Sequence, residues 1–385
     1  MAYCKKDRII VPLLFLFAAV VWRSPYYVLS LYVAIPLFIA YCFWHYFADI
    51  CKCKYWKPYL FLIIWMLLSC AMNPESDASF RRMIPITASF LLAFSTYSIA
   101  KNSRHTWILY VSYIALLFYL LYSNITYNAG FVASFDYSNE VERSNNMKLN
   151  ANDYAYYMLF ASISLKLLME NYLTNIKHLW KILLYAVFMA LSFYIALMTA
   201  SRQVLTLQIP LFAFFLFYDL FWTKKKGSSL AVIVLLVGII VALPIAVEMY
   251  SNSYLAVRSQ VGYQDDIRST LLKRAMEQGC ENPIFGLGLG ADTFFSHCTY
   301  THLFARVGAP ALIAFLLIVI PSAREQLKKF RRSGDYYYFL CFVFLSFIAI
   351  GHFLYSYIDE PFMMSIAFLI IGQSEGRERR MNYNE

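Results

Sequence analysis

The chain has 385 residues, of which 61% are hydrophobic and 15% are charged. Its mean hydropathy of +0.54 indicates a polytopic membrane protein and excludes an ordinary soluble domain. The formal net charge is +10. We attribute most of this charge to membrane topology and predict no nucleic-acid partner, because no soluble basic module is present to bind one.

The apolar residues gather in twelve runs bounded by polar or basic clusters. Most runs can cross a hydrocarbon core of about 30 Å as helices, and barrel strands are excluded because the runs are apolar on every side. We therefore predict an all-α polytopic protein with one transmembrane domain over residues 1–385. The predicted spans are residues 9–22, 26–48, 58–72, 83–100, 106–123, 154–170, 179–198, 203–222, 230–249, 303–322, 336–357 and 361–373.

The first run follows Lys5, Lys6 and Arg8, which also fits a signal peptide. Residues 20–25 offer no small-x-small cleavage site, so we expect a retained helix.

Lysine and arginine are divided unevenly between the two sides of the predicted membrane. With the N-terminus inside, the inner segments carry 21 of the 33 basic residues and 13 of these are Lys, whereas the outer segments carry 11 and only two are Lys. This bias predicts both termini on the cytoplasmic side. It also places two loops outside, at residues 124–153 and, larger, at 250–302.

Outer arginines suit a phosphate or pyrophosphate group, because a guanidinium makes paired hydrogen bonds to phosphate oxygens. The plainer interpretation is that they are interfacial anchors or surface ion pairs. Arg202 is the best candidate, because it follows an abrupt outer turn and begins an inward helix with Ser201 as a plausible cap. A cation at this end of a helix is unfavourable unless an anion lies in front of it, which predicts a bound phosphate.

The larger outer loop contains an amphipathic stretch, residues 267–279, which Asp265 and Asp266 precede. We predict a short helix that ends at Gly279 and presents Arg268 to the lipid head groups; the alternative is a helix that only covers the bundle. Residues 282–290, with three glycines at alternate positions, fit neither dinucleotide nor P-loop spacing and predict a tight turn.

Two histidines, His297 and His302, follow this turn on the outer side. A neutral imidazole can take the proton of a sugar hydroxyl that attacks a glycosyl donor. A histidine that only packs or caps the following helix is the competing interpretation.

Several of these residues occur in an order that resembles a known family: Thr199-Ala200-Ser201-Arg202, then Arg268, then Asn282-Pro283-Ile284-Phe285-Gly286-Leu287-Gly288, then His297 and Gly308. The chain resembles the O-antigen ligases and O-antigen polymerases. The resemblance implies a GT-C-like, metal-independent inverting glycosyltransferase that uses an undecaprenyl-pyrophosphate-linked glycan.

By matched position, Arg202 and Arg268, with Ser201, would hold the pyrophosphate, and His297 would be the base. Secondary candidates are Arg274, Arg306, His302 and Asn152, the last in a stretch similar to an asparagine motif of the family.

The chain departs from the family in having Cys298 where an asparagine usually follows the histidine. An oxidising compartment would also allow a disulfide between Cys280 and Cys298. The chain has no Asp-x-Asp pair, and Cys51 with Cys53 lacks further ligands for a metal. We expect no metal and no other cofactor.

The expected acceptor is lipid A core, which a ligase uses, because one late outer loop dominates; a polymerase joining lipid-linked repeats is the alternative. The expected location is the bacterial inner membrane, with the active site on the periplasmic side. A flippase or transporter for the same glycans is less favoured, because Lys166 and Asp219 lie toward span ends, whereas transporters place such groups near the bilayer centre.

Overall fold

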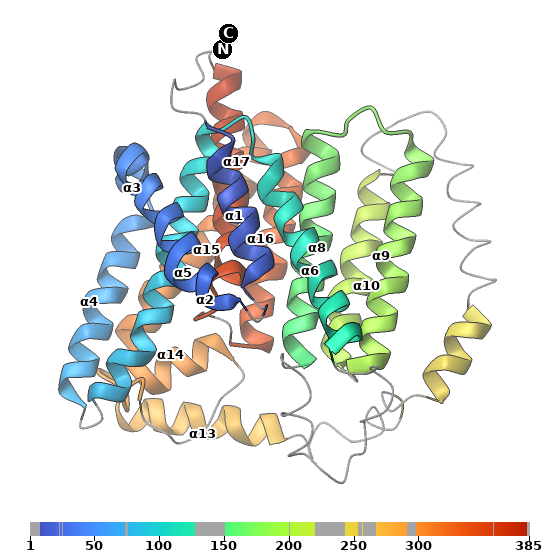
Figure 1. Ribbon diagram of the computed structural model, residues 1–385. Coiled ribbons are helices and arrows are strands. Elements are labelled where there is room, and N and C mark those ends of the chain that lie inside the picture. The colour runs from blue at the N-terminus through green and yellow to red at the C-terminus, as the bar shows by residue number, and fades with distance from the viewer. Residues whose placement is uncertain are drawn as a thin grey trace. The chain divides into compact units, whose positions relative to one another are not determined.

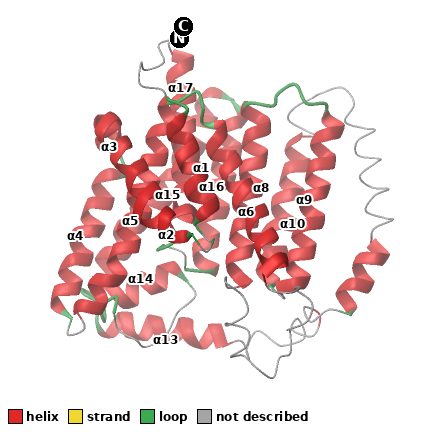
Figure 2. Ribbon diagram, in the orientation of Figure 1, coloured by secondary structure: helices red, strands yellow, loops and turns green. Residues whose placement is uncertain are grey.

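The computed structural model describes residues 8–22, 24, 26–73, 76–127, 151–199, 201–219, 243–252, 256, 267–290, 298–356 and 358–382. This part of the chain is helical and contains no strand (Figure 2). The chain divides into two compact units. Unit 1 comprises Met1–Ala18, Val28–Leu109 and Tyr263–Glu385, and unit 2 comprises Ala19–Tyr27 and Tyr110–Gly262.

The helices of each unit follow the chain in order, and the boundary between the units crosses α1, α2 and α6. Unit 1 contains most of α1 (Ile10–Val21) and α2 (Tyr27–Leu29), then the π-helix η1 (Ser30–Ala34), α3 (Ile35–Lys52), α4 (Trp56–Met72), α5 (Ser76–Asn102), α13 (Ile267–Glu281), α14 (Thr299–Val307), α15 (Ala309–Ser333), α16 (Tyr336–Leu354) and α17 (Pro361–Asn382). Unit 2 contains most of α6 (Trp107–Tyr127), then α8 (Ala151–Asn171), α9 (His178–Thr199) and α10 (Arg202–Phe217).

Every predicted run except 230–249 coincides with one or more described helices; most of that run lies outside the described residues. Five of the described helical segments are long and apolar enough to cross a membrane by length and composition: Tyr27–Lys52, Asp77–Asn102, Leu179–Leu197, Ala309–Ser333 and Tyr336–Leu354. An all-α fold is therefore confirmed for the described residues, and the number of spans predicted, about twelve, stays a prediction. The ends of the predicted loop 124–153 are helical, because α6 extends to Tyr127 and α8 begins at Ala151.

In unit 1, α17 packs along α5 through two glycines one turn apart. A Cβ atom at Gly376 would lie 2.7 Å from the carbonyl oxygen of Lys101, and one at Gly372 would overlap that of Tyr97. Small residues at this spacing allow two helix backbones to approach closely. The contact ends in an ion pair between Lys101 Nζ and Glu375 Oε2 at 2.9 Å.

The helix α13 runs crosswise to the long helices of unit 1 (Figure 1). It packs against α14, with Ala275 and Gly279 buried. The prediction that this helix ends at Gly279 is wrong: it continues to Glu281. Gly279 is instead a close contact, because a Cβ atom there would overlap the ring of Phe304 on α14.

The predicted span 303–322 is also corrected. The chain breaks at Gly308, whose φ is 95°, so that α14 is a separate helix of 9 residues and α15 begins at Ala309. Only a glycine adopts this conformation without strain. The break separates the residues of α14 from the membrane-spanning candidate that follows.

Candidate functional site

The predicted turn is present at residues 282–290, and it closes the end of α14. The amide of Leu287 donates to Ala305 O and that of Gly288 to Arg306 O, both at 2.9 Å, and the amide of Ala309 donates to Pro283 O at 2.7 Å. The first two bonds satisfy carbonyl groups that the end of a helix leaves without intrahelical partners, and the third ties the start of α15 to the turn. The turn therefore fixes the position of the last residues of α14.

Glycines are required where the turn meets α14. Gly286 has a φ of 64°, and Gly308 has a φ of 95°. A Cβ atom at Gly286 would overlap the backbone of Arg306, and one at Gly308 would overlap Ile284 O. The glycine pattern of the sequence thus reflects backbone packed directly on backbone.

The helix α4 anchors the same turn from its other side. Trp65 Nε1 donates to Ile284 O at 3.0 Å and to Val307 O at 3.2 Å, and its ring stacks on Phe285 at 5.3 Å between centroids. Ser69, one turn further along α4, donates to Phe285 O at 2.6 Å. A single helix face therefore ties the turn to the end of α14.

The first turns of α5 reach the end of the glycine segment. The amide of Gly290 donates to Ser79 Oγ at 2.8 Å, and Arg82 Nη1 donates to Leu289 O at 3.3 Å. Because Ser79 and Arg82 are three residues apart on a helix, both face the segment.

Two arginines and a histidine form what we call the Arg82–His302–Arg306 cluster. His302 and Arg306 are one turn apart on α14, and Arg306 is only 4% exposed. Burial, and then the positive charges of Arg306 and Arg82, together lower the pKa of His302 to about 4. The imidazole is therefore neutral at neutral pH, and the two charges that lower its pKa are positive.

The start of α14 is anchored to α16. Thr299 Oγ1 lies 3.0 Å from Nδ1 of the buried His352 and 3.3 Å from Tyr355 O. His297 itself, the predicted base, lies outside the described residues, two positions before Thr299. The disulfide that an oxidising compartment would allow between Cys280 and Cys298 is not formed: Cys280 is exposed, Cys298 is buried, and both are free.

Three residues of the predicted site belong to unit 2. Arg202 begins α10, as predicted, and Ser201 is the N-cap residue, 2% exposed. The expected capping hydrogen bond from the Ser201 side chain to α10 is absent. Asn152 is the second residue of α8, but its side chain lies outside the described part.

The structure thus brings together only part of the predicted site. His302 and Arg306 lie in one cluster, and Arg274 is exposed on α13. Arg268 is the second residue of α13, and its side chain is outside the described part.

Sequence reasoning missed Arg82, Trp65 and Ser69. It treated Arg82 only as an outer charge and did not assign the other two. One signal was present: Trp65 and Ser69 are four residues apart, so they lie on the same face of an otherwise apolar helix.

Unit 2 holds a second charged group, which we call the Lys166 cluster. Lys166, fully buried, lies 2.6 Å from Asp219 Oδ1 and 3.0 Å from Glu170 Oε1, and Tyr185 donates to Asp219 Oδ2 at 2.8 Å. Lys181 also pairs with Glu170, at 3.3 Å. The charges therefore occur as two lysines with two carboxylates.

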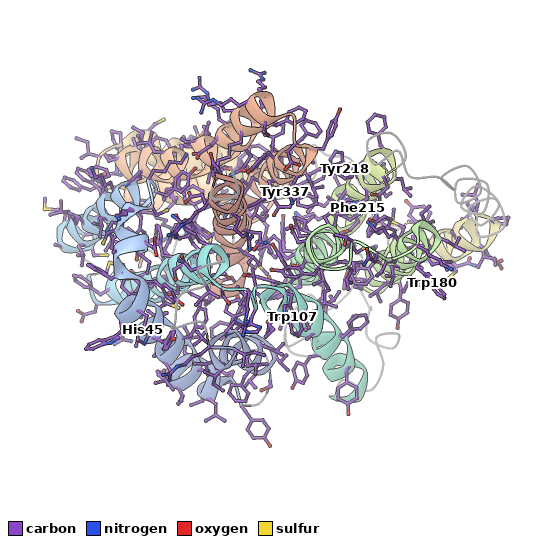
Figure 3. The ribbon with its side chains drawn as sticks, turned by 90° about the horizontal axis from the view of Figure 1, so that it is seen from above. His45, Trp107, Trp180, Phe215, Tyr218 and Tyr337 are labelled. Atoms are coloured by element: carbon purple, nitrogen blue, oxygen red, sulfur yellow. The ribbon has the colours of Figure 1, made fainter. Side chains whose placement is uncertain are left out.

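Aromatic rings surround this ammonium group. Lys166 Nζ lies 4.7 Å from the ring centroid of Tyr218 and 5.9 Å from that of Phe215. Figure 3 labels both rings near one another at the end of α10. The cluster is thus paired and enclosed, as a buried charge requires.

Among the described residues, no three His, Cys, Asp or Glu side chains are grouped so that they could hold a metal ion. A scan against models of known protein families finds no match. A search of curated proteins likewise finds no relative of this chain.

Proposed function

We propose that the chain is an O-antigen ligase-type glycosyltransferase of the bacterial inner membrane. It would transfer a glycan from undecaprenyl pyrophosphate to lipid A core on the periplasmic side, with both termini in the cytoplasm. The observation that supports this best is the Arg82–His302–Arg306 cluster, in which the positive charges of two arginines act on an imidazole on a helix held by the glycine turn.

The chemistry needs an anion site next to a base. Arginines would bind the pyrophosphate of the donor and stabilise it as a leaving group, as metal ions do in other transferases. The base takes the proton of the acceptor hydroxyl, its oxygen bonds to the anomeric carbon, and the bond from that carbon to the pyrophosphate breaks. Attack from the opposite face inverts the linkage.

His297 remains our proposed base, with His302 as the rival. The pKa of His302, about 4 in the ligand-free protein, makes it a weak base, because proton transfer works best near the operating pH. A pyrophosphate bound to Arg82 and Arg306 would offset their charges and raise that pKa. His302 would then gain basicity only when the donor is bound.

Arg202, Arg268 and Ser201 stay in the proposal as pyrophosphate ligands by their match to the family pattern. Arg274 and Asn152 stay as secondary candidates. The contribution of the structure is Arg82, an additional arginine that shares a cluster with Arg306.

The test is glycan transfer in a strain that lacks its own ligase, followed on lipopolysaccharide gels. The wild type should restore a ladder attached to lipid A core, and Arg82→Gln, Arg202→Ala and His297→Ala should lose it while still being expressed. Arg81→Gln is the matched control, because it removes the same charge from the adjacent exposed position. A ladder retained by His297→Ala and lost by His302→Gln would make His302 the base.

Two other outcomes would replace this proposal. If no glycan reaches lipid A core but undecaprenyl-linked repeats lengthen, the protein is the polymerase. If neither product forms, the ligase proposal fails.

A transporter of lipid-linked glycans is the second candidate, and the buried Lys166 cluster favours it. Ionisable groups inside a membrane domain commonly belong to transport or proton pathways. Purified protein in liposomes should then move a fluorescent undecaprenyl-linked sugar between leaflets, and Lys166→Met should abolish the movement. No movement by the wild type would exclude this candidate.

A further inference from the structure

The last part of α15 presents a basic face. Its four exposed cations are spaced by four, three and one residues, so they lie on one side of the helix: Arg324, Lys328, Arg331 and Arg332. Two other polar residues of this part, Gln326 and Lys329, are buried and hydrogen-bond with Ser374 of α17.

Acidic residues near this face are engaged elsewhere. Glu325 contacts Lys54 and Lys329, and Asp335 accepts from Arg377 at 3.0 Å. None of the four exposed cations makes an ion pair with a described residue, in contrast to Lys329, which pairs with Glu378 at 2.7 Å. The face therefore carries positive charge that these neighbouring acids do not offset.

The order of residues along α15 fits a position of this face at the membrane surface. The segment Ala309–Ser333 is long and apolar enough to cross a membrane by length and composition. Its apolar residues come first, at 309–322, and the cations follow. Long basic side chains at such a position extend their charged ends to the lipid head groups.

Aromatic side chains at the turn between α15 and α16 fit the same location. The ring of Phe330 lies 5.4 Å from that of Tyr336 and 5.2 Å from that of Phe339. Aromatic residues with a polar edge, such as Tyr336, are enriched where hydrocarbon meets head groups.

The charge bias that sets membrane topology requires only that cations lie on one side of the membrane. It does not require that they lie on one face of a helix while the nearby acidic residues pair with other cations. We propose that this face of α15 binds the phosphodiester head groups of anionic phospholipids. Arginine can bind the phosphate oxygens in pairs, and clusters of four or more cations beside a membrane helix attract anionic lipids. The proposal is independent of the glycosyltransferase function.

The test compares the full chain with two variants that each lose four positive charges. In the first, Arg324, Lys328, Arg331 and Arg332 are changed to Gln. In the second, the matched control, the exposed Lys52, Lys57, Arg104 and Lys177 of four other segments are changed to Gln. The protein is released from nanodiscs that contain from 0 to about 50 mol% phosphatidylglycerol in phosphatidylcholine, and its retention of phosphatidylglycerol is measured by native mass spectrometry.

We expect the wild type and the control to retain phosphatidylglycerol. The α15 variant should lose affinity by about fivefold for each cation removed, with a weaker dependence on salt. Equal loss in both variants, or retention by the α15 variant, overturns the proposal. So does wild-type stabilisation by inorganic phosphate in phosphatidylcholine nanodiscs that equals the effect of the lipid, because a small-anion site would suffice.

Two smaller variants keep the test decisive if the fourfold change prevents folding. Arg324→Gln with Lys328→Gln, and Arg331→Gln with Arg332→Gln, should each weaken retention to an intermediate level. No loss in either pair contradicts the proposal.

Discussion

The two charged clusters of this protein differ in the charges that lie near their cations. In the Lys166 cluster, two lysines lie beside Glu170 and Asp219, and a tyrosine donates to one of these carboxylates. In the Arg82–His302–Arg306 cluster, the two charges that lower the pKa of the histidine are positive. The first arrangement neutralises itself inside the protein, whereas the second creates a positive potential at an imidazole. Our proposal assigns an anion to the second arrangement, whereas the transporter alternative would use the first.

The largest effect should come from unbalancing the Lys166 cluster. Lys166→Met leaves the carboxylate of Asp219 buried without its cation, which should destabilise unit 2 by about 4 kcal/mol. Denaturant unfolding in detergent micelles measures the loss. Adding Asp219→Leu should recover much of the lost stability, because Glu170 still pairs with Lys181 at 3.3 Å. A double variant no more stable than Lys166→Met would show that the unpaired carboxylate of Asp219 is not the source of the loss.

The next effect concerns the turn that positions the other cluster. Gly308→Ala requires an alanine at a φ of 95°, with a Cβ atom overlapping Ile284 O. We expect a loss of about 3 kcal/mol. Gly334→Ala is the control, because φ is 66° but no atom lies within 4 Å of the added Cβ, and it should cost about 1 kcal/mol. Equal melting temperatures for the two variants would contradict the packing argument.

A smaller effect is expected at the anchor of the same turn. Trp65→Phe keeps a ring to stack on Phe285 but loses the donor to Ile284 O and Val307 O. The loss of stability should be about 1 kcal/mol, with glycan transfer reduced because α14 is held less firmly. Trp44→Phe, at an 85% exposed position, should change neither quantity; a comparable change there would point to a general effect of losing tryptophan.

The last effect appears only below neutral pH and concerns the histidine of the Arg82–His302–Arg306 cluster. The pKa of His302 is about 4 in the folded protein, against about 6.5 in an unfolded chain. Between these values the unfolded state binds more protons, so stability should fall as pH falls from about 6.5 to 4 and be unaffected above it.

Replacing the histidine tests this directly. His302→Gln should show a shallower loss of stability over that window, measured as melting temperature against pH. Arg306→Gln should also be shallower, because one charge that lowers the pKa of His302 is gone. If melting temperature falls with pH equally steeply in the wild type and in both variants, the cluster does not control the loss of stability at acid pH.

Much of the fold was predictable because the sequence signal for each helix lies within the helix itself. The runs that become α5, α9 and α16 are apolar, long and bounded by charges. The turn at 282–290 was predicted from its glycines and is present. The errors came where a glycine has a tertiary role: Gly279 packs against Phe304 and does not end its helix, and Gly308 interrupts a run that looked continuous.

The candidate site was less predictable, because its members are far apart in sequence. The charge of Arg82 acts on His302, because α5 contacts the glycine segment and that segment contacts α14. Lys166 and Asp219 were both noted as charges near span ends, but their pairing at 2.6 Å was not predicted.

The sequence by itself determined the all-α architecture and the position of most helices, because a backbone in hydrocarbon must satisfy its hydrogen bonds within each helix. It also determined the uneven division of lysine and arginine between the two sides of the predicted membrane. Only the tertiary structure decided which charged groups act on one another: that Arg82 and Arg306 act on His302, and that Lys166 is neutralised by carboxylates. The reason is physical, since hydropathy sets where a helix lies along the chain, while side-chain packing sets how helices are rotated and which faces touch.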